Sequence, residues 1–351
     1  MKLSRIELLT PVLLLVPLAF FGVLSVAHGH GKTMPNVVFI LADDLGWTQT
    51  SAYGSSYYKT PNIDRLAKEG VRFLDAYAAA AVCSPTRASI MTGKSPARLH
   101  LTDFIPGRKD GNTPLRQPQW QKFLPLEETT IGEVFKGKGY RTAIFGKWHL
   151  SPEKFGSEAL PYYPDKQGFD DYFVIDKPNP NDNPEDDPHK SDSIGNTSVR
   201  FLHDNANNPF FMYVSFSAIH NPLKDSAAAI ARWEKTNGSQ KAENNPVIGA
   251  MLQRMDRNIG KILNAIDELS LSKNTIVIFF SDNGGLASDA LQTPLRKGKG
   301  WLYEGGIREP LIIRWPGVIK KNTTSDAIVS SYDFLPTFCD LIDVKPPKNI
   351  D

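Results

Sequence analysis

The stretch PNVVFILADD at residues 35–44 decides the fold class of this chain. Its apolar residues follow one another without polar alternation, which is the pattern of a strand buried on both faces of a sheet. Similar apolar runs occupy residues 142–145, 210–215, 275–281 and 311–314. We interpret each run as a buried strand of one central sheet.

Helical patterns lie between these runs. Residues 246–271 carry apolar side chains at three- and four-residue spacing, with polar residues on the opposite face, which predicts a long amphipathic helix. Residues 62–69 and 130–138 each end at a glycine and predict two shorter helices. Another helix is expected at residues 332–342. The alternation predicts an α/β fold with a mostly parallel central sheet flanked by helices on both faces.

Composition narrows the class of protein. The 351 residues carry a formal net charge of +2, and this near-neutral balance argues against a nucleic-acid partner. Hydrophobic residues make up 41% of the chain, enough for a sizeable core. Its two cysteines cannot form a disulfide framework.

The first residues have the pattern of a targeting segment. Lys2 and Arg5 precede an apolar run at residues 12–26, and Ser25-Val26-Ala27 fits a small-residue cleavage site. This pattern predicts a secretory signal peptide at residues 1–27, followed by one domain at residues 28–351. Because the apolar run is short for a membrane anchor, we expect a periplasmic or secreted protein without a stable membrane span.

Polar side chains stand at the ends of several predicted strands: Asp43, Asp44, Lys147, His149, His220, Asp282 and Asn283. Active sites of open parallel sheets gather beyond the carboxyl ends of the strands, so we expect these side chains to meet. The acidic pair and the Asp-Asn pair offer only hard oxygen ligands, which suit Ca²⁺ or Mg²⁺ better than Zn²⁺. A turn or a helix cap would explain either pair alone, but their occurrence at two strand ends favours a metal site.

The segment CSPTRASIMTG at residues 83–93 places Cys83 at the expected start of a helix, with Pro85 and Arg87 at fixed offsets. A lone cysteine is most often a small buried hydrophobe, or half of a disulfide in an exported protein. The surrounding residues favour a different interpretation, because Cys-x-Pro-x-Arg followed by Thr-Gly resembles the signature of the type I sulfatases. These are the formylglycine-dependent sulfatases of the alkaline phosphatase superfamily, arylsulfatases among them.

Four other segments carry the same resemblance in the order of the family: residues 35–46, 146–150 (GKWHL), 281–284 (SDNG) and 298–310 (GKGWLYEGGIREP). The resemblance implies an alkaline phosphatase/sulfatase-like fold and makes residues 28–351 a sulfatase catalytic domain. Members of the family usually continue into a smaller C-terminal subdomain. Since the sequence stops at Asp351, that subdomain would be largely missing. The apolar face of the helix at residues 332–342 would then be exposed.

The resemblance also implies a modified nucleophile. A maturation enzyme would oxidise Cys83 to formylglycine (3-oxoalanine), whose hydrate attacks sulfur with one hydroxyl and expels sulfate through the other. Arg87, one helical turn later, would steady the modified side chain. The divalent cation, Ca²⁺ or alternatively Mg²⁺, would be bound by Asp43, Asp44, Asp282, Asn283 and the modified Cys83.

Four further residues acquire roles by the same resemblance. Lys147 and Lys299 would clamp the sulfate oxygens; Lys299, which precedes Gly300 as in the family pattern, is assigned this role rather than Lys297. His149 would contact the formylglycine hydroxyl and later act as a base. His220 would bind the sulfate and assist the departing alcohol.

The sequence leaves three functions open. The leading one is hydrolysis of a sulfate monoester, on a sulfated carbohydrate or an aryl alcohol. The second is a phosphatase or phosphonate monoester hydrolase of the same superfamily, and the third is a truncated, non-catalytic binder of sulfated glycans. Substrate specificity would lie in loops such as residues 102–121 and 178–192. For His189 in the second loop, an ordinary histidine is favoured over a residue that reaches the substrate. His100 and His203 are interpreted as ordinary histidines.

Overall fold

The computed structural model describes residues 34–108, 111, 115–152, 159–175 and 178–351. The expected signal peptide therefore lies outside the described residues. The chain from Met34 to Asp351 forms one compact unit. Among its described helices, none combines the length and the apolarity needed to cross a membrane.

An eight-stranded sheet runs through this unit in the order β5-β4-β6-β1-β7-β8-β2-β9. Its parallel part consists of β5 (Asp171–Val174), β4 (Arg141–Gly146), β6 (Phe210–Ser215), β1 (Asn36–Ala42) and β7 (Thr275–Ser281). The remaining strands are β8 (Leu311–Arg314), β2 (Val71–Phe73) and β9 (Thr323–Ser325). Because β8 alone among these strands runs antiparallel to its neighbours, the predicted mostly parallel sheet is confirmed. A separate parallel pair joins β3 (Ala76–Tyr77) to β10 (Val329–Ser330).

Strand β1 lies at the centre of the sheet and is buried along its whole length. Its side chains alternate between the two faces, as the pleat requires. Val38 and Ile40 enter one hydrophobic core, whereas Val37, Phe39 and Leu41 enter the other. The continuous apolar run is thus explained by a sheet that has a core on each side.

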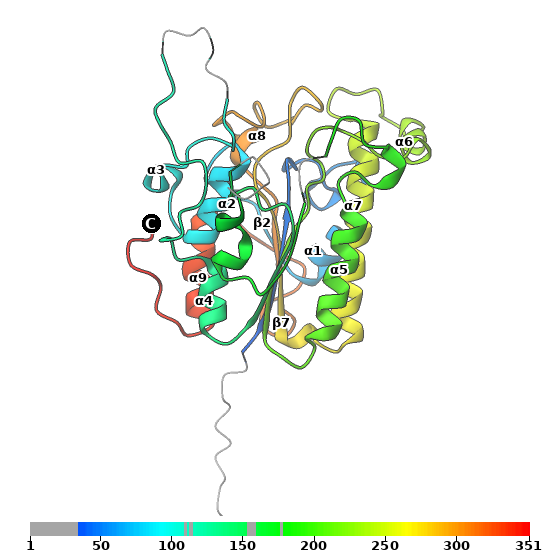
Figure 1. Ribbon diagram of the computed structural model, residues 1–351. Coiled ribbons are helices and arrows are strands. Elements are labelled where there is room, and N and C mark those ends of the chain that lie inside the picture. Colours follow the sequence, from blue (N-terminus) through cyan, green and yellow to red (C-terminus); the bar gives the residue numbers. More distant parts are fainter. Residues whose placement is uncertain (1–33, 109–110, 112–114, 153–158, 176–177) are drawn as a thin grey trace, which may run out of the picture. The chain divides into compact units, whose positions relative to one another are not determined.

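Two layers of helices cover these faces (Figure 1). One layer contains α1 (Pro61–Glu69), α5 (Ser191–Asp204), α6 (Ala227–Glu234) and α7 (Pro246–Glu268). The other contains α2 (Cys83–Thr92), α4 (Ile131–Gly137) and α9 (Phe334–Leu341). The short helices α3 (Pro96–Leu99) and α8 (Glu304–Ile307) lie in connections. Single 3₁₀ turns occur at Ser51–Tyr53, Leu160–Tyr162, Pro164–Gln167, Pro184–Asp186, Ser272–Asn274 and Ser331–Asp333.

Local chemistry sets the limits of the predicted helices. Helix α7 begins after Asn245, whose side chain accepts hydrogen bonds from the first free N–H groups of the helix. Helix α4 begins with a capping box formed by Thr130 and Glu133. Helix α5 was not predicted, because its segment SDSIGNTSVRFLHD is rich in polar residues of low helix propensity. It begins inside the segment 178–192, for which the sequence predicts a loop, so that prediction is wrong at residues 191 and 192.

The apolar face of α9 packs on the main sheet. Phe334, Leu335 and Phe338 are buried, and the ring centroid of Phe334 lies 4.8 Å from that of Phe39 and 5.3 Å from that of Phe280. The expectation that this helix exposes its apolar face is therefore wrong. The reason is that β1 and β7 present large aromatic side chains on the face that α9 covers.

Replacement of Phe334 by alanine should therefore lower the free energy of unfolding by about 3–5 kcal/mol, through lost burial and a residual cavity. Urea denaturation followed by circular dichroism measures this change. Ile328→Ala is the control, because Ile328 is 80% exposed and its truncation should change stability by no more than about 0.5 kcal/mol. Equal effects of the two substitutions would contradict the packing of α9.

Candidate active site

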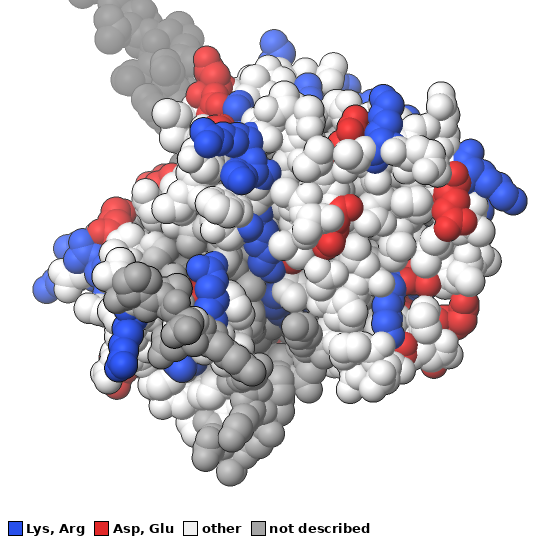
Figure 2. Space-filling model, turned by 90° about the horizontal axis from the view of Figure 1, so that it is seen from above, with Lys and Arg blue, Asp and Glu red and all other residues white. Residues whose placement is uncertain are grey.

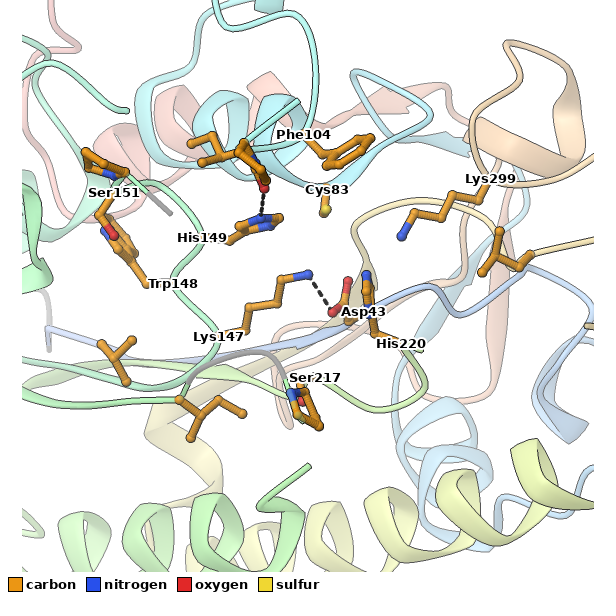
Figure 3. A pocket seen from close by; sticks show the side chains of 17 residues that line it. Asp43, Cys83, Phe104, Lys147, Trp148, His149, Ser151, Ser217, His220 and Lys299 are labelled. Atoms are coloured by element: carbon orange, nitrogen blue, oxygen red, sulfur yellow. Dashed lines mark hydrogen bonds and ion pairs between the residues drawn. The ribbon is translucent and has the colours of Figure 1, made fainter. Parts of the chain in front are cut away.

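Cys83 is the first residue of α2 and is 1% exposed. Val82 before it is extended, so the side chain of Cys83 lies where the helix presents its free N–H groups and its partial positive charge. Ligand atoms of Cys83, Asp43 and Asp282 all lie within 4.8 Å of one another. The predicted nucleophile and two predicted metal ligands are thus brought together; Figure 3 shows Cys83 and Asp43 of this group.

The register of the sheet places the acidic residues side by side. Ala42 at the end of β1 pairs with Ser281 at the end of β7, so Asp43 and Asp282 emerge at the same level. The backbone N–H of Asp44 donates to Asp282 Oδ1 at 3.2 Å, and Asn283 Nδ2 donates to Asp44 Oδ1 at 2.8 Å. All four side chains are buried.

Arg87 connects α2 to the strand ends. Its Nε donates to Asp282 Oδ2 at 2.8 Å, and its Nη1 donates to Ser215 Oγ at 2.7 Å and to the Lys147 carbonyl at 2.9 Å. Although burial opposes its charge, the carboxylates of Asp282 and Asp43 raise its pKa. Arg87 therefore stays cationic and holds the carboxylate of Asp282 beside Cys83.

Lys147 reaches the site because the backbone before it approaches β6 closely. Gly146 has φ +112°, and a Cβ there would lie 1.9 Å from the carbonyl oxygen of Ser215, so only glycine fits. The N–H of Lys147 donates to that same carbonyl at 2.9 Å. Lys147 Nζ then lies 2.7 Å from Asp43 Oδ2.

Lys299 comes from the long connection between β7 and β8. Its N–H donates to the Gly285 carbonyl at 2.9 Å, and its Nζ lies 2.6 Å from Asp44 Oδ1. Lys297, in contrast, is exposed and lies over the ring of Trp301 at 4.5 Å. The structure thus places Lys299 at the acidic cluster and Lys297 outside it.

His149 is held in a single orientation. Because a carbonyl can only accept, the 2.7 Å contact between Nε2 and the Ile105 carbonyl places the ring hydrogen on Nε2. Nδ1 is buried and has no hydrogen-bond partner among the described residues. Burial, together with the charges of Lys147 and Arg87, lowers the pKa of His149 well below its usual value. Its Nδ1 is therefore an available base.

His220 faces the acidic residues from the chain beyond β6. Its Nδ1 donates to the Asn221 carbonyl at 2.6 Å, which leaves Nε2 directed toward Asp44 Oδ2 at 3.8 Å. Burial lowers the pKa of His220 to about 4, although the nearby carboxylate of Asp44 opposes this shift. The Nε2 atom of the neutral ring can accept a proton or a hydrogen bond.

The acidic cluster has the chemistry of a divalent-cation site. Asp43 Oδ1 and Asn283 Oδ1 are buried oxygens without a hydrogen-bond partner in the described part of the chain. Burial and the neighbouring Asp43 carboxylate raise the pKa of Asp282. Burial also opposes ionisation of Asp43, but Lys147, His220, Arg87 and Lys299 together outweigh it and hold the pKa of Asp43 low. Carboxylates crowded in this way favour a cation, and their oxygens suit Ca²⁺ or Mg²⁺.

A pocket of about 330 Å³ opens above these groups. Its polar base includes Cys83 and both lysines, and its walls include Phe104, Ile105 and Pro106 from the loop 102–121 and Pro178 from the loop 178–192. Lys147 and Lys299 line the pocket, and further Lys and Arg side chains, interspersed with Asp and Glu, lie on the face seen from above (Figure 2). The surroundings of the pocket thus favour an anionic substrate.

Several residues of the site were missed by sequence reasoning. Ser215 and Ser217 follow the apolar core of β6, a position that could have indicated them as it indicated His220. Glu309 is fully buried, and neither of its carboxyl oxygens has a partner among the described residues. Burial and the carboxylates of Asp282 and Asp44 raise its pKa. His100 and His203 are exposed and do not line the pocket, whereas His189 is buried and contacts Ser217, which does line it.

Cys83 at a helix N-terminus, an oxygen-ligand cluster and two lysines above a parallel sheet form a site of the kind expected in a sulfuric ester hydrolase, and the comparisons give that class. The family model described as Sulfatase matches residues 35–344, and the chain belongs to the sulfatase family. It is 30% identical to a sulfatase of Formosa agariphila over 90% of this chain, and 31% identical to human arylsulfatase A over 90%. Rat N-acetylgalactosamine-6-sulfatase is 30% identical over 96% of this chain.

Solved structures agree with this family. The protein Ps i-CgsB, solved in complex with k-i-k-neocarrahexaose, superposes with a TM-score of 0.78 at 29% identity, over 91% of this chain and 74% of that chain. The fold is therefore the alkaline phosphatase/sulfatase-like fold. The chain spans 69%, 65% and 67% of the lengths of the three curated relatives named above.

The acidic cluster predicts a cation-dependent stability. A divalent cation that binds only the folded chain should stabilise it by about 2.7 kcal/mol at 100 times its Kd. In Asp43→Asn the rise in Tm on adding Ca²⁺ or Mg²⁺ should be largely lost, because a charged ligand is replaced by a neutral one of the same shape. Asp326→Asn, at an exposed position, should respond like the unaltered chain. Identical calorimetric responses of the two variants would exclude Asp43 as a ligand.

Proposed function

We propose that this chain hydrolyses a sulfate monoester of a carbohydrate or an aryl alcohol, with formylglycine at position 83 as nucleophile and Ca²⁺ as cofactor. The observation that carries the proposal is the position of Cys83. It is buried at the start of α2, within 4.8 Å of two acidic ligand atoms and in the same pocket as Lys147 and Lys299. A thiol that served only as core packing would not need cationic groups around it.

The charges of the cluster explain why a cation and an anionic substrate belong together here. Three buried carboxylates, Asp43, Asp44 and Asp282, face the cations of Arg87, Lys147 and Lys299. These charges already balance, so a bound divalent cation would leave the site with an excess positive charge. When bound by Asp43, Asp44, Asp282, Asn283 and position 83, that cation supplies Lewis-acid stabilisation of charge on the sulfuryl oxygens. Mg²⁺ is the alternative ion.

Binding of the cation would free the two lysines to contact the substrate. Lys147 Nζ and Lys299 Nζ now contact Asp43 and Asp44, which are the carboxylates that a cation would take over. Released from them, both ammonium groups lie at the base of the pocket and can bind sulfate oxygens. Preorganised cations of this kind stabilise the charge that builds up in the transition state.

The two histidines would divide the proton transfers. As a hydrated aldehyde, residue 83 supplies one hydroxyl for attack on sulfur and another for the release of sulfate. The free Nδ1 of His149 would accept the proton of a hydroxyl at position 83. His220 Nε2 faces the opposite side of the cluster, beside Asp44. Because the neutral ring carries its hydrogen on Nδ1, Nε2 would first take up a proton when the substrate binds, and would then donate it to the sulfate group and to the departing alcohol oxygen.

The proposal includes a maturation enzyme that oxidises Cys83 and export of the chain through a signal peptide at residues 1–27. The periplasm or the exterior of the cell is the proposed location. A sulfated glycan or a small sulfate ester is the proposed substrate, and the similar protein Ps i-CgsB was solved in complex with a saccharide, k-i-k-neocarrahexaose. Relative kcat/KM values on 4-nitrophenyl sulfate and 4-nitrophenyl phosphate test the reaction class. A preference for the phosphate would favour the phosphatase or phosphonate monoester hydrolase alternative.

The nucleophile is tested by peptide mass spectrometry of the chain co-produced with a formylglycine-generating enzyme. The peptide that contains Cys83 should show the mass loss of a thiol converted to an aldehyde and should react with a hydrazide. The peptide that contains Cys339 should remain a thiol and serves as the internal control. Cys83→Ala should retain the Tm of the chain and have no turnover. Full activity of a chain whose Cys83 is unmodified would refute the mechanism, and a mature Cys83 without turnover would favour a glycan binder.

The sulfate clamp is tested by methionine substitutions, which remove the charge and keep most of the side-chain volume. Lys147→Met and Lys299→Met should each lower kcat/KM for 4-nitrophenyl sulfate by about 10²- to 10³-fold, the loss typical of one preorganised charge-stabilising group. Lys297→Met is the matched control and should keep near-normal kinetics, because Lys297 lies outside the pocket. A loss in Lys297→Met that equals the loss in Lys299→Met would reassign the clamp.

A further inference from the structure

His189 is a buried histidine that takes no part in the proposed proton transfers. Both nitrogens of its ring make polar contacts. His189 is 2% exposed and lies just before α5. Its Nδ1 is 3.0 Å from Ser217 Oγ and 3.1 Å from the Ser217 carbonyl, and its Nε2 is 3.0 Å from the Pro222 carbonyl. The ring therefore bridges the two ends of the segment 217–222, which carries His220.

The tautomer of His189 follows from these partners. Both ring nitrogens lie near a carbonyl oxygen, but only Nδ1 also lies near a hydroxyl, that of Ser217, which can donate. The hydrogen on Nε2 therefore gives both nitrogens a partner, because Nε2 then donates to the Pro222 carbonyl. Burial lowers the pKa of His189, which keeps the ring neutral and leaves Nδ1 as an acceptor for the hydroxyl of Ser217. The position needs one ring nitrogen that donates and one that accepts. This requirement explains why a histidine, rather than an apolar residue, is buried there.

The bridged segment is also attached to a predicted metal ligand. Ile219 N–H donates to the Asp43 carbonyl at 2.8 Å, and Asp43 N–H donates to the Ala218 carbonyl at 3.2 Å. The N–H of His220 donates to the Ser217 carbonyl at 3.0 Å, the same carbonyl that His189 contacts. The position of the His220 ring in the pocket therefore depends on a turn that His189 closes from below (Figure 3 shows Ser217 and His220).

His189 itself stands on a fixed base. Arg254 of α7 binds Asp192 in the first turn of α5 at 2.7 Å and Asp225, beyond Pro222, at 2.8 Å. The same guanidinium thus ties the start of α5 to the chain that follows the bridged segment. His189 and Arg254 hold the two segments together at neighbouring points.

We infer that His189 is a positioning residue for His220, which it holds in place to protonate the leaving alcohol of the sulfate ester. This inference rests on the proposed function of His220. A positioning role differs from a purely structural one because its loss affects substrates unequally, according to their leaving groups. A misplaced acid matters most when the leaving group is poor and least when the leaving group departs without help.

The experiment uses the mature, cation-loaded chain and a series of aryl sulfates whose phenols differ in pKa. In His189→Phe, which keeps a ring and removes both polar contacts, kcat/KM should fall by about 10- to 100-fold for the poorest leaving group, below the about 10²- to 10⁴-fold effect of a general acid itself. The loss for 4-nitrophenyl sulfate should be much smaller, so the plot of log kcat/KM against phenol pKa becomes steeper. His203→Phe, an exposed histidine of α5, should leave the plot unchanged.

Two further variants separate the inference from the proposed function. His220→Ala should steepen the plot on its own, and His189→Phe added to it should cause little further loss, because the two residues act as a unit. Failure of the unaltered chain to hydrolyse any sulfate ester would overturn the proposed function. Two outcomes would overturn the inference alone, provided that His220→Ala steepens the plot. One is an equal loss of kcat/KM for all aryl sulfates in His189→Phe, and the other is additive losses in the double variant.

A second readout does not need activity. Hydrogen exchange followed by mass spectrometry should show faster exchange of the Ile219 and His220 amides in His189→Phe than in the unaltered chain, while peptides of β7 remain protected. His189→Gln, whose amide can donate to the Pro222 carbonyl, should give intermediate exchange and an intermediate slope, and it also serves if the phenylalanine variant does not fold. If His189→Phe or His189→Gln folds and its Ile219 and His220 amides exchange as slowly as in the unaltered chain, the bridge is contradicted.

Discussion

The attraction between three buried carboxylates and three buried or half-buried cations is the constraint on which the site depends. Asp43, Asp44 and Asp282 stand at the ends of β1 and β7 because the parallel register brings those ends to one level. Each would be costly to bury alone, since an unpaired charge loses its hydration. Arg87, Lys147 and Lys299 come from three different connections, and their contacts bind α2, β4 and the β7–β8 connection to the same edge of the sheet. The electrostatic requirement of the site thus also joins parts of the chain that are distant in sequence.

This arrangement gives the cations two uses. Arg87 is fully enclosed and contacts Asp282 and Ser215, so it serves as a permanent partner. Lys147 and Lys299 retain some exposure and end in the pocket. A group that neutralises a carboxylate in the free protein and an anionic substrate in the complex needs little reorganisation between the two states. Preorganisation of this kind is the usual source of electrostatic stabilisation in enzymes.

Much of this architecture could be predicted from the sequence because its signals are local. Apolar runs without alternation indicated the buried strands, and three- to four-residue spacing indicated α7. Polar residues directly after strands indicated the acidic cluster, since the edge of a parallel sheet gathers whatever follows its strands. The sequence could not show α5, whose polar residues have low helix propensity and which is held by packing on α7 and by the ion pairs of Arg254. Nor could it show the contacts of His189, because its partners lie about 30 residues away and are backbone carbonyls, which have no pattern in a sequence.

The reversed direction of β8 has a consequence for how such a pocket can diversify. Because β8 is antiparallel to β7, the connection that carries Lys299 leaves the sheet and returns to it at the same edge, beside the acidic cluster. It needs no crossover beneath the helices, so both of its ends are anchored to neighbouring strands whatever its length. The entropy of closing a flexible loop grows slowly, by about 0.6 kcal/mol for each doubling of its length. Insertions in this connection could therefore reshape one wall of the pocket while the strands, the lysine anchor and the two cores stay unchanged.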